Sequence, residues 1–272
     1  MTRKMRGYQV APTTAIASII EAKNEGADIL RYQVLSYTQD IEVWKSEVAS
    51  QVNYFLTVKN TFSPVQVVMD LHKCPNENRL ENLKWFWNMV WTTVGSSVVY
   101  GILNEPDETV ARNKIIMTEM VKFIRKLSPS IIISVTCPYS DPQKFRHTPY
   151  IEKDPNIWYE FHYYMPDAFT AQGIAGKPTG KKYPSPRNDS KQMLKNLQQV
   201  TNFKAAHPSA QIYVGEFSCV DFADDDSRAA YTKDCIINFK RLSAHFTWHA
   251  WREWEHWQPS GKTLTVLRNN ML

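Results

Sequence analysis

Residues 65–71, Val-Gln-Val-Val-Met-Asp-Leu, form a short and mostly apolar run, and a second run, Ile131-Ile132-Ile133, is apolar without interruption. Continuous apolar runs of this length are typical of strands that are buried on both faces, as in parallel sheets covered by helices. The two runs therefore predict a parallel sheet in the interior of the protein.

Further β-rich stretches lie on both sides of these runs and alternate with helical patterns. The predicted strands are residues 5–10, 28–34, 65–71, 97–103, 131–136, 157–163, 211–217 and 245–251. The predicted helices are residues 13–25, 41–60, 80–94, 108–127 and 190–206, and a further one that follows residues 224–227 and continues through Leu242. The fifth and eighth helices have no clear pattern. Eight strands alternating with helices predict a closed (β/α)8 TIM barrel. An open doubly wound sheet is the alternative, but no G-x-G-x-x-G motif follows the first strand.

The bulk composition is that of one ordinary globular domain. The chain has 272 residues, of which 43% are hydrophobic and 22% charged. Because α/β barrels of about 250 residues fold as one unit, we expect residues 1–272 to form a single catalytic domain, acting as a monomer. The net charge of +5 is mild and argues against a nucleic-acid binder, which would carry a concentrated basic face.

The four cysteines and the chain start leave two questions open. No Cys-x-x-Cys pair occurs, which argues against a zinc ribbon, but Cys219 and Cys235 could form a disulfide. No secretory apolar segment or long apolar run is found, so we expect no membrane partner. The start at residues 1–4 fits either a cytosolic protein or a secreted one whose signal peptide is absent from this chain, and we expect the secreted form.

An acidic run, Asp224-Asp225-Asp226, precedes the helix predicted to continue through Leu242. Such a run could be a calcium loop. Carboxylates at a helix N-terminus are the commoner arrangement, because the helix dipole favours negative charge there.

Polar and aromatic residues gather where the predicted strands end. In a barrel of this kind the βα loops at the carboxyl ends of the strands carry the chemistry. Arg31 lies within the second strand. The ends of the third, fourth, sixth, seventh and eighth strands supply Asp70, His72, Asn104, Glu105, His162, Tyr164, Glu216, Trp248 and Trp251. We therefore expect these side chains to share one rim.

Two glutamates on the same rim point to glycoside hydrolysis. Glu105 ends the fourth strand and Glu216 the seventh. One carboxylic acid can protonate the leaving oxygen while the other carboxylate stabilises or attacks the anomeric carbon. The neighbouring residues have competing structural interpretations. Arg31 could form a structural ion pair, His72 could be a core histidine, and Asp70 could be a structural carboxylate. Each tryptophan could equally fill the core.

An ordered set of motifs resembles glycoside hydrolase family 5, the main cellulase family of clan A. The Asn-Glu-Pro motif of the fourth strand stands at Asn104-Glu105-Pro106, and the nucleophile motif at Gly215-Glu216-Phe217. The other matching segments are Met5-Arg6-Gly7, Asp70-Leu71-His72, Phe161-His162-Tyr163-Tyr164, residues 169–173 and residues 247–254. The chain departs from the family at Ala171, where a histidine is frequent, and at Trp248 and Trp251, where tyrosine and phenylalanine are frequent.

The resemblance implies a role for each rim residue. Glu105 would be the acid/base and Glu216 the nucleophile of a retaining mechanism. Asn104 would hold a sugar 2-hydroxyl, and the remaining substrate-binding residues would be Arg31, His72, His162, Tyr164, Trp248 and Trp251. No cofactor and no metal is expected, since His245, His249 and Glu253 lack the H-E-x-x-H arrangement.

The sequence therefore predicts an endo-acting β-1,4-glucanase whose partner is a β-linked polysaccharide. The enzymatic alternatives are a β-mannanase and a β-1,3- or mixed-linkage glucanase. The non-enzymatic alternative is a barrel that binds carbohydrate without cleaving it.

Overall fold

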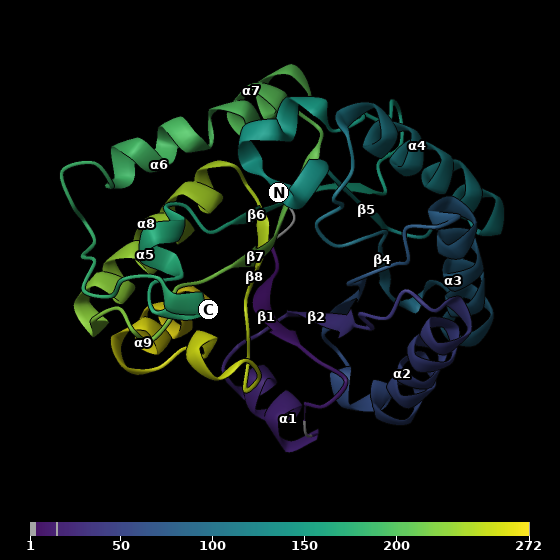
Figure 1. Cartoon of the computed structure of the whole chain (residues 1–272), viewed down its shortest axis with the longest axis horizontal. Helices are drawn as coiled ribbons and strands as arrows, with labels where there is room; N and C mark the ends of the chain where they lie inside the picture. Colours follow the sequence, from purple (N-terminus) through teal and green to yellow (C-terminus); the bar gives the residue numbers. More distant parts are fainter. Residues whose placement is uncertain (1–3, 15, 272) are drawn as a thin grey trace.

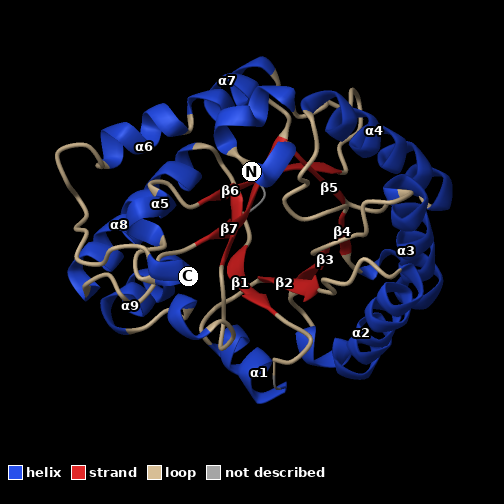
Figure 2. Cartoon of the chain, viewed as in Figure 1, coloured by secondary structure: helices blue, strands red, loops and turns tan. Residues whose placement is uncertain are grey.

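The computed structural model describes residues 4–14 and 16–271. Eight parallel strands close into a barrel in chain order, with β1 paired to β8, and helices surround them (Figures 1 and 2). The strands are β1 Arg6–Val10, β2 Ile29–Val34, β3 Gln66–Leu71, β4 Val99–Gly101, β5 Ile133–Thr136, β6 Ile157–Tyr163, β7 Gln211–Phe217 and β8 His245–Trp248. This arrangement confirms the predicted (β/α)8 barrel.

Most helices lie close to their predicted positions, and the short helix after β6 is one that the sequence did not predict. The α-helices are α1 Ile16–Asn24, α2 Ile41–Phe62, α3 Arg79–Val94, α4 Val110–Leu127, α5 Asp167–Thr170, α6 Ser190–Asn196, α7 Gln198–Ala206, α8 Asp225–Arg241 and α9 Gly261–Met271. The helix predicted over residues 190–206 is divided at Leu197. The short 3-10 turns η2 Pro138–Ser140 and η3 Pro142–His147 replace a fifth helix after β5, and α9 follows β8. The remaining 3-10 turns are η1 Gly95–Ser97, η4 Ile174–Gly176 and η5 Glu255–Trp257.

Inside the barrel, an apolar layer lies below a polar one. The apolar layer is a cluster of buried side chains, Ile29, Val68, Val99, Trp158 and Tyr213. Because side chains alternate between the two faces of a strand, the residue two positions further along points inward again. Those positions hold Arg31, Asp70, Gly101, Glu160 and Gly215. The polar layer therefore begins one step above the apolar one, toward the carboxyl ends of the strands.

The acidic run is the start of a helix. Asp224 is the N-cap of α8, and its carboxylate accepts a hydrogen bond from the backbone N–H of Ser227. Asp225 accepts from the backbone N–H of Lys262, whose ammonium pairs with Asp226. These contacts account for all three carboxylates through helix capping and pairing with the start of α9, as the helix-dipole interpretation predicts.

The four cysteines are all free and buried, so the possible bridge between Cys219 and Cys235 is not formed. Burial raises the pKa of the Cys219 and Cys74 thiols to about 12. Among the described residues, no helix has both the length and the apolarity that crossing a membrane requires.

The burial of all four thiols leads to a testable expectation. Unfolding the protein without reductant should release four titratable thiols, whereas the folded protein should react slowly, because a buried thiol is inaccessible and its thiolate is disfavoured. The measurement is thiol titration with a chromogenic disulfide before and after addition of denaturant. A plateau at two thiols would instead indicate a bridge.

Candidate active site

Arg31 lies on β2 in the centre of the polar layer, with its side chain fully buried. One guanidinium nitrogen donates to Gln9 at 2.7 Å and to the Glu216 carboxylate. The other donates to Asn104 at 2.8 Å and lies 2.9 Å from an Asp70 oxygen and 3.3 Å from a Glu160 oxygen. Burial disfavours the guanidinium charge, but the three carboxylates outweigh it and hold the pKa of Arg31 well above its ordinary value.

Glu216 lies one residue before the end of β7 and is an ionised carboxylate held from two sides. One oxygen accepts from Arg31, and the other accepts from the Tyr164 hydroxyl at 2.8 Å. Burial raises the pKa of Glu216, but the positive charges of His162 and Arg31 prevail and leave it well below the usual range. Burial raises the pKa of Tyr164 well above its ordinary value, and the Glu216 charge raises it further, so the hydroxyl keeps its proton and donates.

Glu105 lies just beyond β4 in a different environment. The backbone N–H of Asn104 still pairs with Leu71 of β3, whereas Glu105 leaves the strand with a φ of 39°. A residue other than glycine rarely adopts this conformation, and such residues cluster at functional sites. The Glu105 side chain is 38% exposed, against 6% for Glu216, so the two carboxylates differ in their access to solvent.

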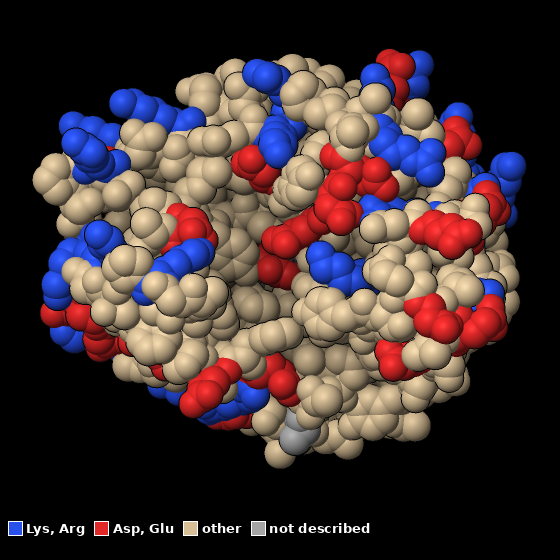
Figure 3. Space-filling view, viewed as in Figure 1, with Lys and Arg blue, Asp and Glu red and all other residues tan. Residues whose placement is uncertain are grey.

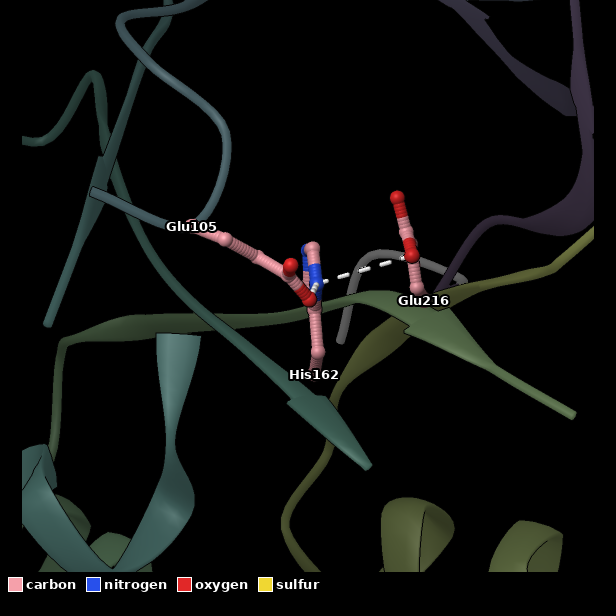
Figure 4. Close-up of side chains that lie close together, drawn as sticks. All are labelled: Glu105, His162 and Glu216. Atoms are coloured by element: carbon pink, nitrogen blue, oxygen red, sulfur yellow. Dashed lines mark hydrogen bonds and ion pairs between the residues drawn. The ribbon is translucent and has the colours of Figure 1, made fainter. Parts of the chain in front are cut away.

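His162 on β6 lies between the two glutamates (Figure 4). Its Nδ1 is 2.9 Å from a Glu105 oxygen and 3.6 Å from a Glu216 oxygen. The ligand atoms of these three residues lie within 4.8 Å of one another, a spacing that could also suit a metal ion. The charges of Arg31 and of the imidazole next to Glu216 oppose a further cation there, so we interpret the group as a hydrogen-bonded cluster.

The other polar residues predicted from the strand ends lie against this cluster. His72 Nδ1 is 3.3 Å from Asp70, and its Nε2 is 3.4 Å from the side-chain nitrogen of Asn104. Asp70 is buried and paired with Arg31, as a structural carboxylate would be. The structure therefore brings together Arg31, His72, Asn104, Glu105, His162, Tyr164 and Glu216.

The two tryptophans predicted to bind substrate lie elsewhere. Trp248 and Trp251 are 0% and 1% exposed, and their indole N–H groups donate to the backbone carbonyls of Trp257 and Ser18. Thr247 points into the barrel, where its hydroxyl bonds to Tyr213, so Trp248 must point outward into the layer between strands and helices. Neither ring has a free face for a sugar, and this part of the prediction is wrong.

Three further residues contribute to the site and were not singled out as site residues from the sequence. Glu160 on β6 lies beneath His162, with its Oε1 3.2 Å from His162 Nε2. Tyr37, in the loop after β2, is 63% exposed and lines a groove of about 100 Å³ beside Glu105. His249, directly after β8, has its ring centroid 6.3 Å from that of Tyr164. Glu160 could have been found by extending the inward alternation of β6 down from His162, whereas loop positions such as Tyr37 give no comparable signal.

An aromatic path leads from Glu216 toward a second pocket. The ring of His249 lies 6.0 Å from that of Trp254, which is 41% exposed. Trp254 lines a pocket of about 400 Å³ together with Pro12, Leu35, Gln51 and Glu253. The face of the molecule seen in Figure 3 is hollowed near its centre, and Asp and Glu side chains gather along the hollow. An open cleft with both polar and aromatic walls suits a sugar chain.

The closed barrel and its paired rim carboxylates define a protein of the glycosidase type. The family model for cellulases, described as glycosyl hydrolase family 5, matches residues 2–256. The chain belongs to this family and is a glycoside hydrolase, which favours an enzyme over a barrel that only binds carbohydrate. No curated protein sequence matches the chain significantly.

Solved structures share the fold at low sequence identity. The cellulose synthase subunit Z of Clostridioides difficile is 20% identical with a TM-score of 0.80, covering 99% of this chain and 100% of its own. Thermotoga maritima Cel5A in complex with mannotriose is 16% identical with a TM-score of 0.78, covering 98% and 97%. A hyperthermophilic endo-β-1,4-glucanase in complex with substrate is 19% identical with a TM-score of 0.76, covering 96% of both chains.

The different burial of the tryptophans predicts different effects of substitution. Trp248→Ala should lower the free energy of unfolding by about 3–5 kcal/mol, because it empties a core site. Trp254→Ala should change stability little but weaken binding of long oligosaccharides, since an exposed ring is lost. Denaturant unfolding and calorimetric binding would measure the two effects. Normal oligosaccharide binding by Trp254→Ala would show that this ring does not contact the substrate.

Proposed function

We propose that this glycoside hydrolase cleaves β-1,4-linked glucan within the chain by a retaining double displacement. Glu216 is the nucleophile and Glu105 the general acid and base. The observation that carries the proposal is the pair of carboxylates in one cluster whose surroundings differ, one fixed as an anion and one exposed to the cleft. Environments that separate two titratable groups in this way commonly assign acid and base roles.

The contacts of Glu216 suit a nucleophile. Its charge is stabilised by Arg31, while Tyr164 fixes the orientation of its second oxygen. The carboxylate is therefore ionised when substrate arrives and can attack the anomeric carbon, forming a glycosyl ester. Asn104, fixed by Arg31, would hold the sugar 2-hydroxyl, a contact that strengthens in the transition state.

The position of Glu105 suits proton transfer. Its carboxyl group reaches the cleft, and its contact with His162 fixes the direction in which it points. In the first step Glu105 protonates the leaving oxygen, and in the second it removes a proton from the water that attacks the ester. His72 would line the same subsite as a hydrogen-bonding group.

The spacing of the carboxylates supports retention. Oxygens of Glu105 and Glu216 lie within 4.8 Å of each other. Retaining glycosidases hold their carboxyl groups about 5–5.5 Å apart, whereas inverting ones leave about 6.5–9.5 Å for a water molecule. The shorter spacing leaves room for direct attack by Glu216 rather than for a water between the two groups.

Glucan is the favoured substrate, and β-mannan is the second candidate. The family is that of the cellulases, and one solved neighbour is an endo-β-1,4-glucanase bound to substrate. Thermotoga maritima Cel5A was solved both with cellobiose and with mannotriose. For this reason β-mannan stays a candidate substrate of the present chain. A β-linked polysaccharide is thus the expected partner.

Substitution of either glutamate by glutamine tests the proposal. On carboxymethyl cellulose and barley glucan, Glu105→Gln should lower kcat by about 10²–10⁴-fold, because proton transfer is lost. Glu216→Gln should lower it at least as far, since the nucleophile is lost. The melting temperature should change little in Glu105→Gln, whose side chain is partly exposed. Turnover is measured as reducing ends released, with mannan, xylan and laminarin assayed in parallel.

Glu119→Gln is the matched control, because Glu119 lies on the outer helix α4 and pairs with Lys122 of the same helix. This variant should retain wild-type turnover. Wild-type turnover by either site variant would refute the assigned roles. Faster hydrolysis of mannan than of glucan would show that mannan is the substrate, and it would leave the proposed mechanism unchanged.

A further inference from the structure

A third buried glutamate, Glu160, lies directly beneath the two proposed catalytic carboxylates. It is 4% exposed and comes from β6, two residues before His162. Its Oε1 is 3.2 Å from His162 Nε2 and 3.3 Å from Arg31, and its Oε2 accepts from the Ser134 hydroxyl at 2.6 Å. The mechanism described above assigns this residue no part, yet its contacts connect β2, β5 and β6.

The hydrogen-bond partners of the His162 ring determine which of its nitrogens carry hydrogen. Burial raises the pKa of Glu160, but Arg31, His162 and Ser134 outweigh it and leave the pKa below the ordinary value. An ionised carboxylate only accepts hydrogen bonds, so His162 Nε2 must carry a hydrogen. Its Nδ1 faces the ionised Glu216, which can only accept, and lies 2.9 Å from a Glu105 oxygen. Burial lowers the pKa of His162, but Glu216, Glu105 and Glu160 raise it to about 10, so the ring is an imidazolium at neutral pH.

The backbone leaves room for this pair of side chains. A Cβ atom at Gly215 would lie 1.9 Å from the Glu160 oxygen and 2.9 Å from His162 Nε2. Strand β7 has an irregularity at the same place, since Phe161 pairs with Val214 while His162 pairs with Glu216. The glycine before Glu216 is thus required by the Glu160–His162 contact, and the bulge places Glu216 beside the imidazole.

We propose that Glu160 is a positioning residue that holds His162 as an imidazolium throughout the reaction, so that Glu105 can ionise when it must act as a base. The inference rests on the proposed roles of Glu105 and Glu216. When Glu216 becomes a glycosyl ester it loses its charge, and Glu160 then remains as the buried carboxylate that supports the cation. His162 neither gains nor loses a proton. Glu105 gives its proton to the leaving oxygen and regains one from the attacking water.

Several charged or titratable groups surround the imidazole and share in its electrostatics. They are Arg31 from β2, Glu105 after β4, Glu160 from β6, Glu216 from β7 and His249 after β8. Burial lowers the pKa of His249 to about 4, so it contributes no charge at neutral pH. Arg31 opposes the imidazolium, and of the groups just named Glu105 and Glu160 are the two that still favour it once Glu216 is esterified. Removing Glu160 at that stage therefore affects the ionisation of Glu105 through His162.

The test compares Glu160→Gln with Asp70→Asn. Both variants remove a buried carboxylate from Arg31, but no hydrogen bond or ion pair joins Asp70 to His162 among the described residues. With an aryl β-cellobioside that has a good leaving group, deglycosylation limits kcat, and the acidic limb of its pH profile reports the ionised base. Glu160→Gln should move this limb to higher pH by about one unit, whereas Asp70→Asn should leave it in place.

Nitrogen NMR of ¹⁵N-histidine-labelled protein provides a readout that does not depend on turnover. In the wild type and in Asp70→Asn, His162 should show two protonated ring nitrogens at pH 7, and in Glu160→Gln the ring should become neutral near that pH. A His162 that stays charged in Glu160→Gln, or a limb that moves equally in both variants, overturns the inference. If the wild type cleaves no glycoside, the proposed function fails while the NMR comparison still tests the effect of Glu160 on His162.

Glu160→Asp covers the case in which Glu160→Gln does not fold. It keeps the negative charge but shortens the side chain, which withdraws the carboxylate from His162 Nε2. The acidic limb should then move in the same direction as in Glu160→Gln, by a smaller amount. An unmoved limb in Glu160→Asp, together with an unchanged His162 titration, would also overturn the inference.

Discussion

The burial of the Arg31 guanidinium is the constraint on which the rest of the interior depends. A buried charge without partners is very costly, and breaking a buried ion pair typically costs about 3–5 kcal/mol. The barrel meets this demand with acceptors from separate segments, namely Gln9, Asp70, Asn104, Glu160 and Glu216. Because these acceptors converge only when the barrel is closed, the fold and the site form together.

The same cation links stability to chemistry. Together with His162, Arg31 keeps Glu216 ionised, and it also fixes Asn104, which we expect to contact the sugar. The negative charge gathered around Arg31 in turn supports a second cation at His162. The proposed active site therefore alternates positive and negative side chains above the apolar layer of the barrel, and the proposed ester at Glu216 would remove one of the negative charges.

Much of this arrangement could be predicted from the sequence, because strand ends are easy to locate. Apolar runs such as residues 65–71 fix where β3 ends, and hence where Asp70 and His72 lie. Glu160 was not predicted because it lies in the middle of a strand, away from the strand end where site residues are expected. Only the alternation of side chains along β6 shows that it points inward, like His162. Trp248 was wrongly predicted to bind substrate because it lies near the end of a strand. Side chains alternate along the strand, and since Thr247 points into the barrel, Trp248 points outward. The fifth helix had no pattern because short 3-10 turns take its place, and their local contacts leave no periodic apolar face.

The claim that Glu216 attacks the sugar is tested most directly by trapping the covalent intermediate. A 2-deoxy-2-fluoro β-cellobioside with a dinitrophenolate leaving group slows both steps, because the fluorine destabilises the oxocarbenium-like transition state. The leaving group needs little help from the acid, so the glycosyl ester should accumulate. Mass spectrometry of the digested protein should then find one sugar on the peptide that contains Gly215-Glu216-Phe217. A sugar attached to Glu105, or hydrolysis that gives a product of inverted configuration with no adduct, would contradict the account.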